Sequence, residues 1–407
     1  MKKIGIIGAG ASGLYAAINL KNQNTDVTIL EKNDRIGKKI LMTGNGRCNI
    51  TNAKFYDEFL ENIVTNQKFL YSSFSQHDNY ASMDFFQSKG LELVTEEYDR
   101  VFPKSQKSTD VIRFFEREII KNNIKLITNT EVLSIKKFEK FLVKTDKKNY
   151  DFDYLIIATG GLSYPNTGAT GDGYKFAKNF GHKITKIIPS LVPIFFKDKD
   201  LENIKALSLE NIEIKAETNK GDFSQLGPVL LTKNFISGPS VLRLSSFIVG
   251  TDVRQISLNL SVLDENELDK TLIEIFDKNP NKDISNVLDN IVPNALSPVI
   301  IKRAHINPDK KSNQITKDER SRIVKNIKNF TLDFDKFGGF NTAVITKGGV
   351  DVRDIDPKTM ESKLVFDLYF VGEVLDIDAL TGGFNLQIAF TSAFAASSAI
   401  KEKIWLI

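Results

Sequence analysis

The sequence has little cysteine and histidine, the residues that form disulfide bonds and bind metal ions. It contains one cysteine, Cys48, so no internal disulfide can form, and a reducing compartment such as the cytoplasm is expected. The three histidines, His77, His182 and His305, have no cysteine or carboxylate at ligand spacing, so no metal site is expected. The chain enters a strand pattern at Ile4, which leaves no room for a signal peptide.

Long apolar runs and an excess of one charge are also missing. No run approaches the ~20 residues that span a bilayer, so no membrane association is expected. The 55 basic and 51 acidic residues give a net charge of only +4. That balance does not produce the cationic field of a dedicated nucleic-acid binder, and no stable protein partner is implied. At 407 residues the chain is long enough for more than one structural unit.

The first thirty residues predict a strand, a helix and a second strand. Ile4–Ile7 is an apolar run typical of a buried parallel strand, and Val27–Leu30 is another. Between them, Ser12–Lys21 carries apolar residues at helical spacing. The Gly- and Asn-rich segment that follows, Gly37–Asn52, predicts a loop with a functional role.

The turn after the first strand reads Gly8-Ala9-Gly10-Ala11-Ser12-Gly13, the pattern of a dinucleotide fingerprint. Gly8 permits the tight turn, Gly10 lets the backbone approach a pyrophosphate, and Gly13 lets helix and strand pack closely. The helix N-terminus offers free N–H groups to phosphate oxygens. Glu31, after the second strand, can accept hydrogen bonds from ribose hydroxyls and would repel the 2′-phosphate of NADP. The alternative is a glycine-rich turn that arose by chance.

Two later strands also lead into glycine turns. Tyr154–Ala158 runs into Thr159-Gly160-Gly161, and Leu368–Val371 runs into Gly372–Asp376. Three such turns from separate parts of the chain suit a long ligand lying across strand ends, such as FAD, although each late turn alone could be an ordinary connection. Gly382-Gly383 precedes a predicted final helix, whose N-terminus would stabilise the negative charge of a reduced flavin.

The middle of the chain has a different character. It alternates apolar and polar residues, which predicts half-buried antiparallel strands, and it contains helical patterns near Glu265–Lys278, Ile284–Ile291 and Lys317–Lys328. We therefore expect a discontinuous FAD-binding domain over residues 1–190 and 342–407, interrupted by an inserted substrate domain over residues 191–341.

Motifs along nearly the whole chain resemble those of one bacterial flavoprotein family. They are Gly8–Gly13, Thr43–Asn52 with its Gly-Arg-Cys-Asn sequence, Ala158–Gly161, Ser163–Pro165, Gly171–Gly173, Ile236–Pro239, Gly348–Val350, Thr359–Ser362, Gly372–Asp376 and Thr381–Gln387. The chain resembles the NAD(P)/FAD-dependent oxidoreductases that include BaiN-type bile-acid reductases, RdsA-type rRNA dihydrouridine synthases and aminoacetone oxidase. The resemblance implies an α/β fold. It further implies that the chain has a Rossmann-like FAD domain of the two-dinucleotide-binding type and an inserted domain, which is a β-barrel with helices. The flavin ring would lie between these two domains.

The motifs and the resemblance together predict the cofactor-binding residues. The resemblance implies that Gly46, Arg47 and Cys48 lie near the cofactor and that Lys39 lies close to its phosphates. The full predicted set is Gly8, Gly10, Ala11, Ser12, Gly13, Glu31, Lys32, Lys39, Gly46, Arg47, Cys48, Val132, Thr159, Gly160, Gly161, Gly372, Glu373, Asp376, Gly383, Phe384, Asn385 and Leu386. No second Gly-x-Gly-x-x-Gly motif occurs, so NAD(P)H would act as a transient donor.

The proton donor is not evident from the sequence. Reducing a C=C bond requires a hydride from the flavin and a proton from a nearby acid. Relatives often have Thr-His where this chain has Thr232-Lys233, and many have Gly-Tyr-Asn where it has Gly383-Phe384-Asn385. Lys233, if buried, and Cys48 are the candidates; the alternatives are a solvated lysine and a packing cysteine.

We therefore predict an FAD-dependent oxidoreductase that reduces a C=C bond, of a small molecule or of a uridine in rRNA, at the interface of the two domains. Basic residues over Lys302–His305, Lys310-Lys311 and Lys317–Lys328 could face RNA or form a solvated helix face. The alternative functions are a flavin oxidase acting on a small amine or amino acid, and a non-catalytic FAD-binding redox protein.

Overall fold

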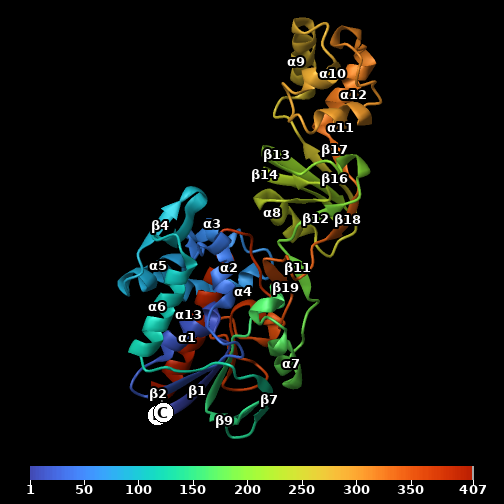
Figure 1. Cartoon of the computed structure of the whole chain (residues 1–407). Helices are drawn as coiled ribbons and strands as arrows, with labels where there is room; N and C mark the ends of the chain where they lie inside the picture. Colours follow the sequence, from blue (N-terminus) through green and yellow to red (C-terminus); the bar gives the residue numbers. More distant parts are fainter. Residues whose placement is uncertain (406–407) are drawn as a thin grey trace. The chain divides into compact units, whose positions relative to one another are not determined.

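A computed structural model describes residues 1–405 of the chain (Figure 1). The chain forms two compact units. The first comprises Met1–Ser190 and the chain from Phe340 onward, and the second comprises Leu191–Gly339. Each unit is built around its own cluster of buried apolar side chains.

A five-stranded parallel sheet forms the centre of the first unit, in the order β20-β10-β1-β2-β6. Its strands are β1 (Lys2–Ile7), β2 (Thr25–Leu30), β6 (Lys125–Ile127), β10 (Tyr154–Ile157) and β20 (Leu368–Phe370). Every residue of β10 and β20 is buried, as expected for parallel strands covered on both faces. Because β20 comes from the end of the chain, two separate stretches build this sheet.

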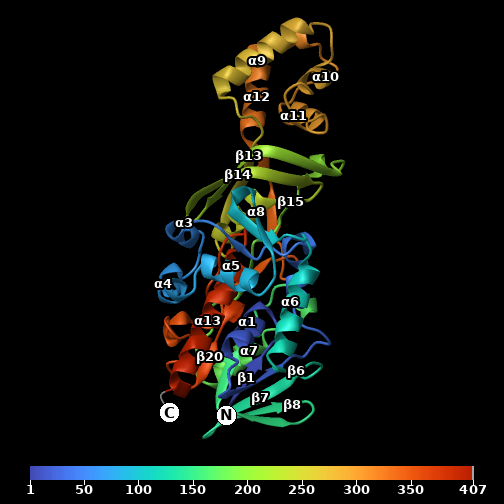
Figure 2. The same cartoon turned by 90° about the vertical axis from the view of Figure 1, so that its left-hand side faces the viewer.

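Two helices from opposite ends of the chain, α1 (Ala11–Leu20) and α13 (Phe384–Trp405), pack against each other (Figures 1 and 2). The other helices of this unit are α2 (Lys38–Met42), α3 (Tyr56–Leu60), α4 (Gln67–Gln76), α5 (Asn79–Ser88), α6 (Ser108–Lys121) and α7 (Asp172–Asn179). Small antiparallel sheets complete it, made of β3 (Thr51–Asn52), β5 (Arg100–Pro103) and β4 (Leu93–Glu96); of β7 (Val132–Lys137), β8 (Phe141–Thr145) and β9 (Asn149–Phe152); and of β11 (Ile188–Ser190) and β19 (Ile345–Lys347).

The second unit contains a seven-stranded antiparallel sheet in the order β17-β16-β13-β14-β15-β12-β18. The strands are β12 (Ile194–Phe196), β13 (Ala206–Thr218), β14 (Gly221–Thr232), β15 (Phe235–Ser237), β16 (Val253–Asn259), β17 (Phe330–Leu332) and β18 (Phe334–Phe337). Only Asp333 separates β17 from β18, so one bent segment joins the two edges of the sheet in the manner of a barrel. The helices are α8 (Pro239–Ile248), α9 (Glu265–Lys278), α10 (Ile284–Leu288), α11 (Ser297–Arg303) and α12 (Lys317–Lys328).

The prediction of an α/β fold with an inserted antiparallel unit is confirmed, but the prediction for Gly37–Asn52 is wrong in part. This segment contains α2, a 3₁₀ turn over Thr43–Gly46 and β3. The physical reason is burial. The side chains of Ile40, Cys48 and Ile50 are buried in the core of the first unit, so the segment packs against the rest of the protein and forms regular structure. Among the described residues, no helix combines the length and the apolar character needed to cross a membrane.

Candidate functional site

The carboxyl ends of β1, β2 and β10 border a cavity of 210 Å³, and all the residues that line it belong to the first unit. The turn after β1, the residues after β2, the turn after β10 and the start of α13 each contribute to its wall. In open α/β sheets, ligands bind at this edge. The cavity is therefore the candidate cofactor site.

Helix α1 begins at this cavity without a cap. Its N-cap residue is Gly10, which has no side chain to accept from the first N–H groups, and no acidic residue lies in the first turn of the helix. Gly10, Ala11 and Ser12 line the cavity. Free N–H groups and the positive end of the helix dipole favour an anion at such a terminus.

The glycines around the cavity serve two purposes. A Cβ on Gly13 would lie 2.0 Å from the Gly8 carbonyl oxygen, and a Cβ on Gly8 would lie 2.5 Å from that of Ala158. These two glycines therefore allow protein elements to touch. A Cβ on Gly10 or Gly160 would meet nothing within 4 Å, although both residues line the cavity, so these two leave room for a ligand. The buried Thr159 hydroxyl on the same wall has no hydrogen-bond partner among the described residues.

Acidic side chains fix the part of the wall that follows β2. Glu31 Oε2 accepts a hydrogen bond from the Ala9 N–H at 2.7 Å, and Oε1 accepts one from the Asn33 N–H at 2.8 Å. Lys32 forms an ion pair with Asp172 at 2.7 Å. Burial acts to raise the pKa of Asp172, but hydrogen bonds from Lys32 and Thr170 outweigh it and lower that pKa to about 2. Asp172 is therefore ionised at neutral pH, and Glu31 is held in place by its two N–H donors.

A hydrogen-bonded network ties four distant segments together at the cavity. Lys39 Nζ donates to Glu373 Oε2 at 2.6 Å and to Ser163 Oγ at 2.5 Å. Glu373 Oε1 accepts from Ser163 Oγ at 2.7 Å and from the Thr346 N–H at 2.9 Å. Lys39 and Glu373 line the cavity. Neither Ser163 nor Thr346 was predicted to have a role. Ser163 lies within a family motif, whereas no sequence pattern marks Thr346.

Most of the predicted cofactor-binding residues line this cavity. They are Gly8, Gly10, Ala11, Ser12, Glu31, Lys32, Lys39, Val132, Thr159, Gly160, Glu373, Asn385 and Leu386. The cavity wall does not include Gly13, Gly46, Arg47, Cys48, Gly161, Gly372, Asp376, Gly383 or Phe384. Two of these have a packing role instead, since a Cβ on Gly161 would lie 2.4 Å from Thr346 Oγ1 and one on Gly383 would lie 2.3 Å from the Thr51 carbonyl oxygen.

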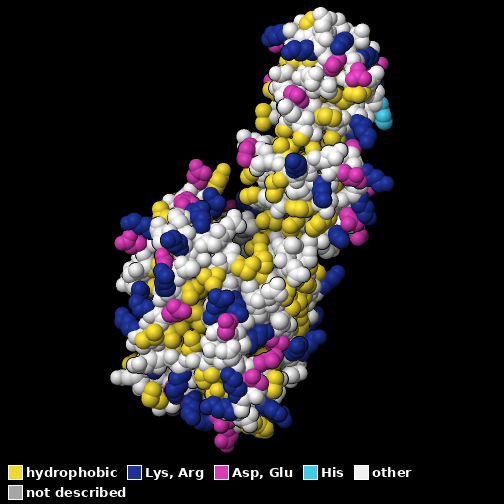
Figure 3. Space-filling model, viewed as in Figure 1, with side chains coloured by type: hydrophobic (Ala, Val, Ile, Leu, Met, Phe, Trp, Pro, Cys, Tyr) yellow, Lys and Arg dark blue, Asp and Glu magenta, His cyan; other side chains and the backbone are white. Residues whose placement is uncertain are grey.

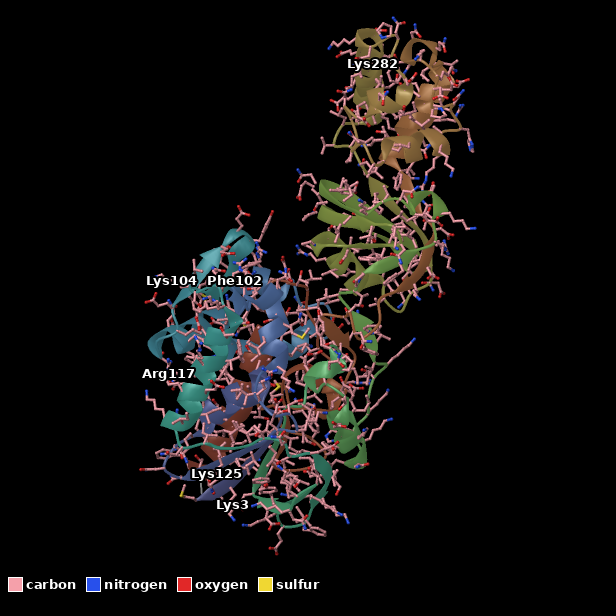
Figure 4. All side chains as sticks on the ribbon, viewed as in Figure 1. Lys3, Phe102, Lys104, Arg117, Lys125 and Lys282 are labelled. Carbon is pink, nitrogen blue, oxygen red and sulfur yellow. The ribbon has the colours of Figure 1, made fainter. Side chains whose placement is uncertain are left out.

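Arg47 and Cys48 are engaged within the protein. Arg47 pairs with Glu96 at 2.5 Å, donates to Gln106 at 2.6 Å, and lies 4.0 Å from the ring centre of Phe102, which Figure 4 labels. Cys48 is buried, and this burial raises the pKa of its thiol to about 12. A thiol of that kind is inert at neutral pH, because the thiolate is the reactive form.

Lys233 lies exposed in the turn between β14 and β15, so the burial that its catalytic role would require is not found. Some basic residues of the second unit form ion pairs. Arg303 binds Asp198 and Asp200, each at 2.8 Å, and Lys310 binds Glu319 at 2.7 Å. Figure 3 shows acidic side chains interspersed with the basic ones on the face in view. These ion pairs neutralise part of the basic stretch that the sequence offered as a surface facing RNA.

The parallel sheet, the glycine turns and the uncapped helix define the chain as a Rossmann-type dinucleotide-binding protein. The family model described as HI0933-like protein Rossmann domain matches residues 2–399. The chain belongs to this HI0933-like family, which confirms the family recognised from the motifs, and it is an FAD-dependent oxidoreductase.

Two relatives match over nearly their whole length. The ribosomal RNA dihydrouridine synthase of Haemophilus influenzae is 30% identical over 405 residues, covering 98% of each chain. The 3-dehydro-bile acid delta(4,6)-reductase of Clostridium scindens is 29% identical, covering 99% of this chain and 100% of the reductase. Among solved structures, 3-ketosteroid delta1-dehydrogenase from Sterolibacterium denitrificans has a TM-score of 0.50 at 12% identity, covering 99% of this chain and 100% of the dehydrogenase, a likeness of fold.

Proposed function

We propose that the protein uses FAD to reduce a C=C bond that is conjugated to a carbonyl group. The observation that carries this proposal is the full-length similarity to two relatives whose named substrates differ greatly in size. A uridine base and a 3-dehydro-bile acid share one feature: each has a C=C bond conjugated to a carbonyl group. A hydride at the far carbon and a proton at the near carbon reduce such a bond.

The cavity residues fit FAD. The free N–H groups at the start of α1 would hold the pyrophosphate, and Glu31 would accept hydrogen bonds from the ribose hydroxyls. Gly10 and Gly160 leave the open space that a close backbone approach needs. Bound there, the flavin would supply the hydride, while the chain binds, orients and excludes water.

The electron donor we propose is NAD(P)H, which would visit the flavin transiently, because the chain has only one Gly-x-Gly-x-x-Gly motif. The acceptor is a small molecule or a uridine in rRNA, and its binding between the two units stays a prediction. The single buried cysteine supports a reducing compartment, so we place the reaction in the cytoplasm.

An anaerobic two-step experiment tests this function. The purified holoenzyme receives NADH or NADPH, and the flavin absorbance is followed until it bleaches. An unmodified rRNA transcript, or a 3-keto bile acid with conjugated C=C bonds, is then added. We expect one of the two to restore the oxidised spectrum without oxygen. Bleaching by a small amine, with peroxide formed in air, would identify an oxidase instead; a flavin that no donor reduces would indicate a non-catalytic redox protein.

A further inference from the structure

Side chains join two sides of the cavity next to Glu31, the residue proposed to bind the ribose of FAD. On one side, Lys32 and Asn33 follow β2 and line the cavity. On the other side, residues 167–170 and Asp172 line it, between β10 and the first residue of α7. The residues that meet here are 134 to 140 positions apart in the chain. Their contacts therefore close one part of the cavity wall.

Lys32 forms the first bridge between the two sides with its ammonium group. Its Nζ donates to Asp172 Oδ2 at 2.7 Å and also to Thr170 Oγ1, and the Thr170 hydroxyl donates to the same Asp172 oxygen at 2.7 Å. Hydrogen bonds between charged groups are stronger than those between neutral groups. The side chains of Lys32 and Asp172 are 27% and 20% exposed, so this ion pair lies where the cavity wall meets solvent.

Asn33 forms a second bridge beside the first. Its Nδ2 donates to the Thr167 carbonyl oxygen at 3.1 Å and to Glu31 Oε1 at 2.6 Å. Lys38 Nζ donates to Asn33 Oδ1 at 3.2 Å, so both ends of the Asn33 amide are held. Because Glu31 is the residue proposed to accept from the ribose hydroxyls, this bridge closes the cavity beside the adenosine half of FAD.

Gly168 allows the two bridging side chains to lie against the opposite wall. A Cβ at this position would lie 2.5 Å from Asn33 Nδ2 and 3.2 Å from Lys32 Cε, and the backbone φ of +98° is one that a residue with a side chain rarely adopts. Gly168 lies in the middle of residues 165–171, which we call the strap. The strap therefore packs directly on both bridging side chains, and it ends where α7 begins.

We propose that the strap is a latch over the adenosine half of FAD, held shut by Lys32 and Asn33, and that its opening sets the rates at which FAD enters and leaves. This proposal rests on the function proposed above, which places FAD in the cavity. Each bridge joins two groups of the protein, so it forms with or without the cofactor. A ligand that passes this wall must break the bridges, and the free energy of breaking them slows entry and exit alike.

The test measures both rate constants of FAD exchange. Stopped-flow mixing of FAD-free protein with FAD gives the association rate constant from the change in flavin fluorescence. Displacement of bound FAD by excess 5-deaza-FAD, which absorbs at a different wavelength, gives the dissociation rate constant. In Lys32→Met, we expect both to rise about tenfold, the effect of losing one charge-assisted hydrogen bond, with the Kd changed less than about threefold. Loss of a positive charge alone would slow the association of anionic FAD, the opposite result.

Two further variants separate opening of the latch from a change of charge. Gly168→Ala changes no charge, but its Cβ would push the Asn33 amide away from the strap, so both rate constants should rise here too. The matched control is Lys175→Met. Lys175 Nζ pairs with the other oxygen of Asp172, Oδ1, at 3.2 Å, but its side chain is 73% exposed and does not line the cavity. This control removes the same charge and should exchange FAD at wild-type rates.

Each other outcome has a definite meaning. Faster dissociation of FAD from Lys32→Met without faster association would overturn the latch, because Lys32 would then be only a contact to the ligand. Unchanged rate constants in Lys32→Met and Gly168→Ala would overturn it too, as would an equal acceleration in Lys175→Met. In these cases every variant still binds FAD, and the proposed function stands. Wild-type protein that takes up no FAD would instead contradict the proposed function, and the latch with it.

Discussion

Helix α1 in the first unit and helix α12 in the second begin in opposite ways. At α12, Thr316 Oγ1 accepts from the Glu319 N–H, and Glu319 Oε2 accepts from the Thr316 N–H at 2.8 Å, which completes a capping box. At α1, Gly10 provides no side chain at all. A capped helix satisfies its own first N–H groups, whereas an uncapped one leaves them for a ligand. At the cavity, α1 thus departs from the capping pattern that α12 follows.

The largest effect should come from filling the contact that brings α1 against β1. In Gly13→Ala, the new Cβ would lie 2.0 Å from a backbone oxygen that cannot swing aside. We expect a loss of about 3 kcal/mol in the free energy of unfolding, the upper range for overpacking, together with loss of bound FAD. Urea unfolding of the FAD-free protein measures the first effect. An unchanged midpoint would show that α1 can move away from β1, contrary to the packing described.

The two units also differ in whether they contain a buried histidine that makes stability depend on pH. His77 of the first unit is buried against Phe394 and bonded to Tyr15, and burial lowers its pKa to about 4, whereas His305 of the second unit is exposed. The His77 side chain binds a proton near pH 6.5 in the unfolded chain and only near pH 4 in the folded chain. Its neutral form therefore contributes fully to the free energy of unfolding above about pH 6.5, and that contribution is lost as the pH falls from 6.5 to 4. The loss should reach about 3 kcal/mol.

Unfolding of His77→Gln and wild type by urea, between pH 7 and 4.5, measures this contribution. The variant should lose less stability than wild type over that range. Parallel curves for the two proteins would mean that His77 titrates alike in the folded and unfolded states.

The open glycine should behave differently from the packed one. In Gly10→Ala, the added methyl meets no protein atom within 4 Å and the backbone φ of −85° is ordinary for alanine, so the unfolding free energy should change by less than about 0.5 kcal/mol. The methyl would occupy space reserved for the ligand. FAD affinity should fall at least about tenfold, or about 1.4 kcal/mol, measured by titrating the FAD-free protein. Wild-type affinity would show that the ligand does not approach this backbone.

The smallest effect should come from the capped helix. Thr316→Ala removes an N-cap and should cost about 1 kcal/mol of stability in the second unit. FAD affinity should not change, because Thr316 belongs to the second unit and does not line the cavity. Thermal unfolding and FAD titration of the same sample test both parts. Weaker FAD binding in this variant would contradict the assignment of the cofactor to the first unit alone.

The features that could be predicted from the sequence are those that residues close together in the chain determine. The bounds of α9 and α12 agree with the prediction because Asp264 and Thr316 form capping boxes at their starts. The fingerprint at Gly8–Gly13 was recognisable because strand, turn and helix are consecutive there, and most of the residues predicted to bind the cofactor line one cavity. The unpredicted features depend on contacts between residues distant in the chain.

Lys39 and Glu373 show why. Their ion pair at the cavity joins residues 334 positions apart, so no spacing in the sequence reveals it. The same holds for Gly383, where the close neighbour is the backbone of Thr51. A glycine motif indicates that something must come close, but the sequence does not distinguish a ligand from another part of the chain.

The measurement that tests the central claim most directly is the visible spectrum of the purified protein, recorded before and after reconstitution with FAD and then during anaerobic addition of NADH and NADPH. We expect one oxidised flavin per chain, bound at the uncapped start of α1, with rapid bleaching by at least one nicotinamide. A protein that takes up no flavin even after reconstitution would contradict the assignment of the cavity and, with it, the proposed reduction.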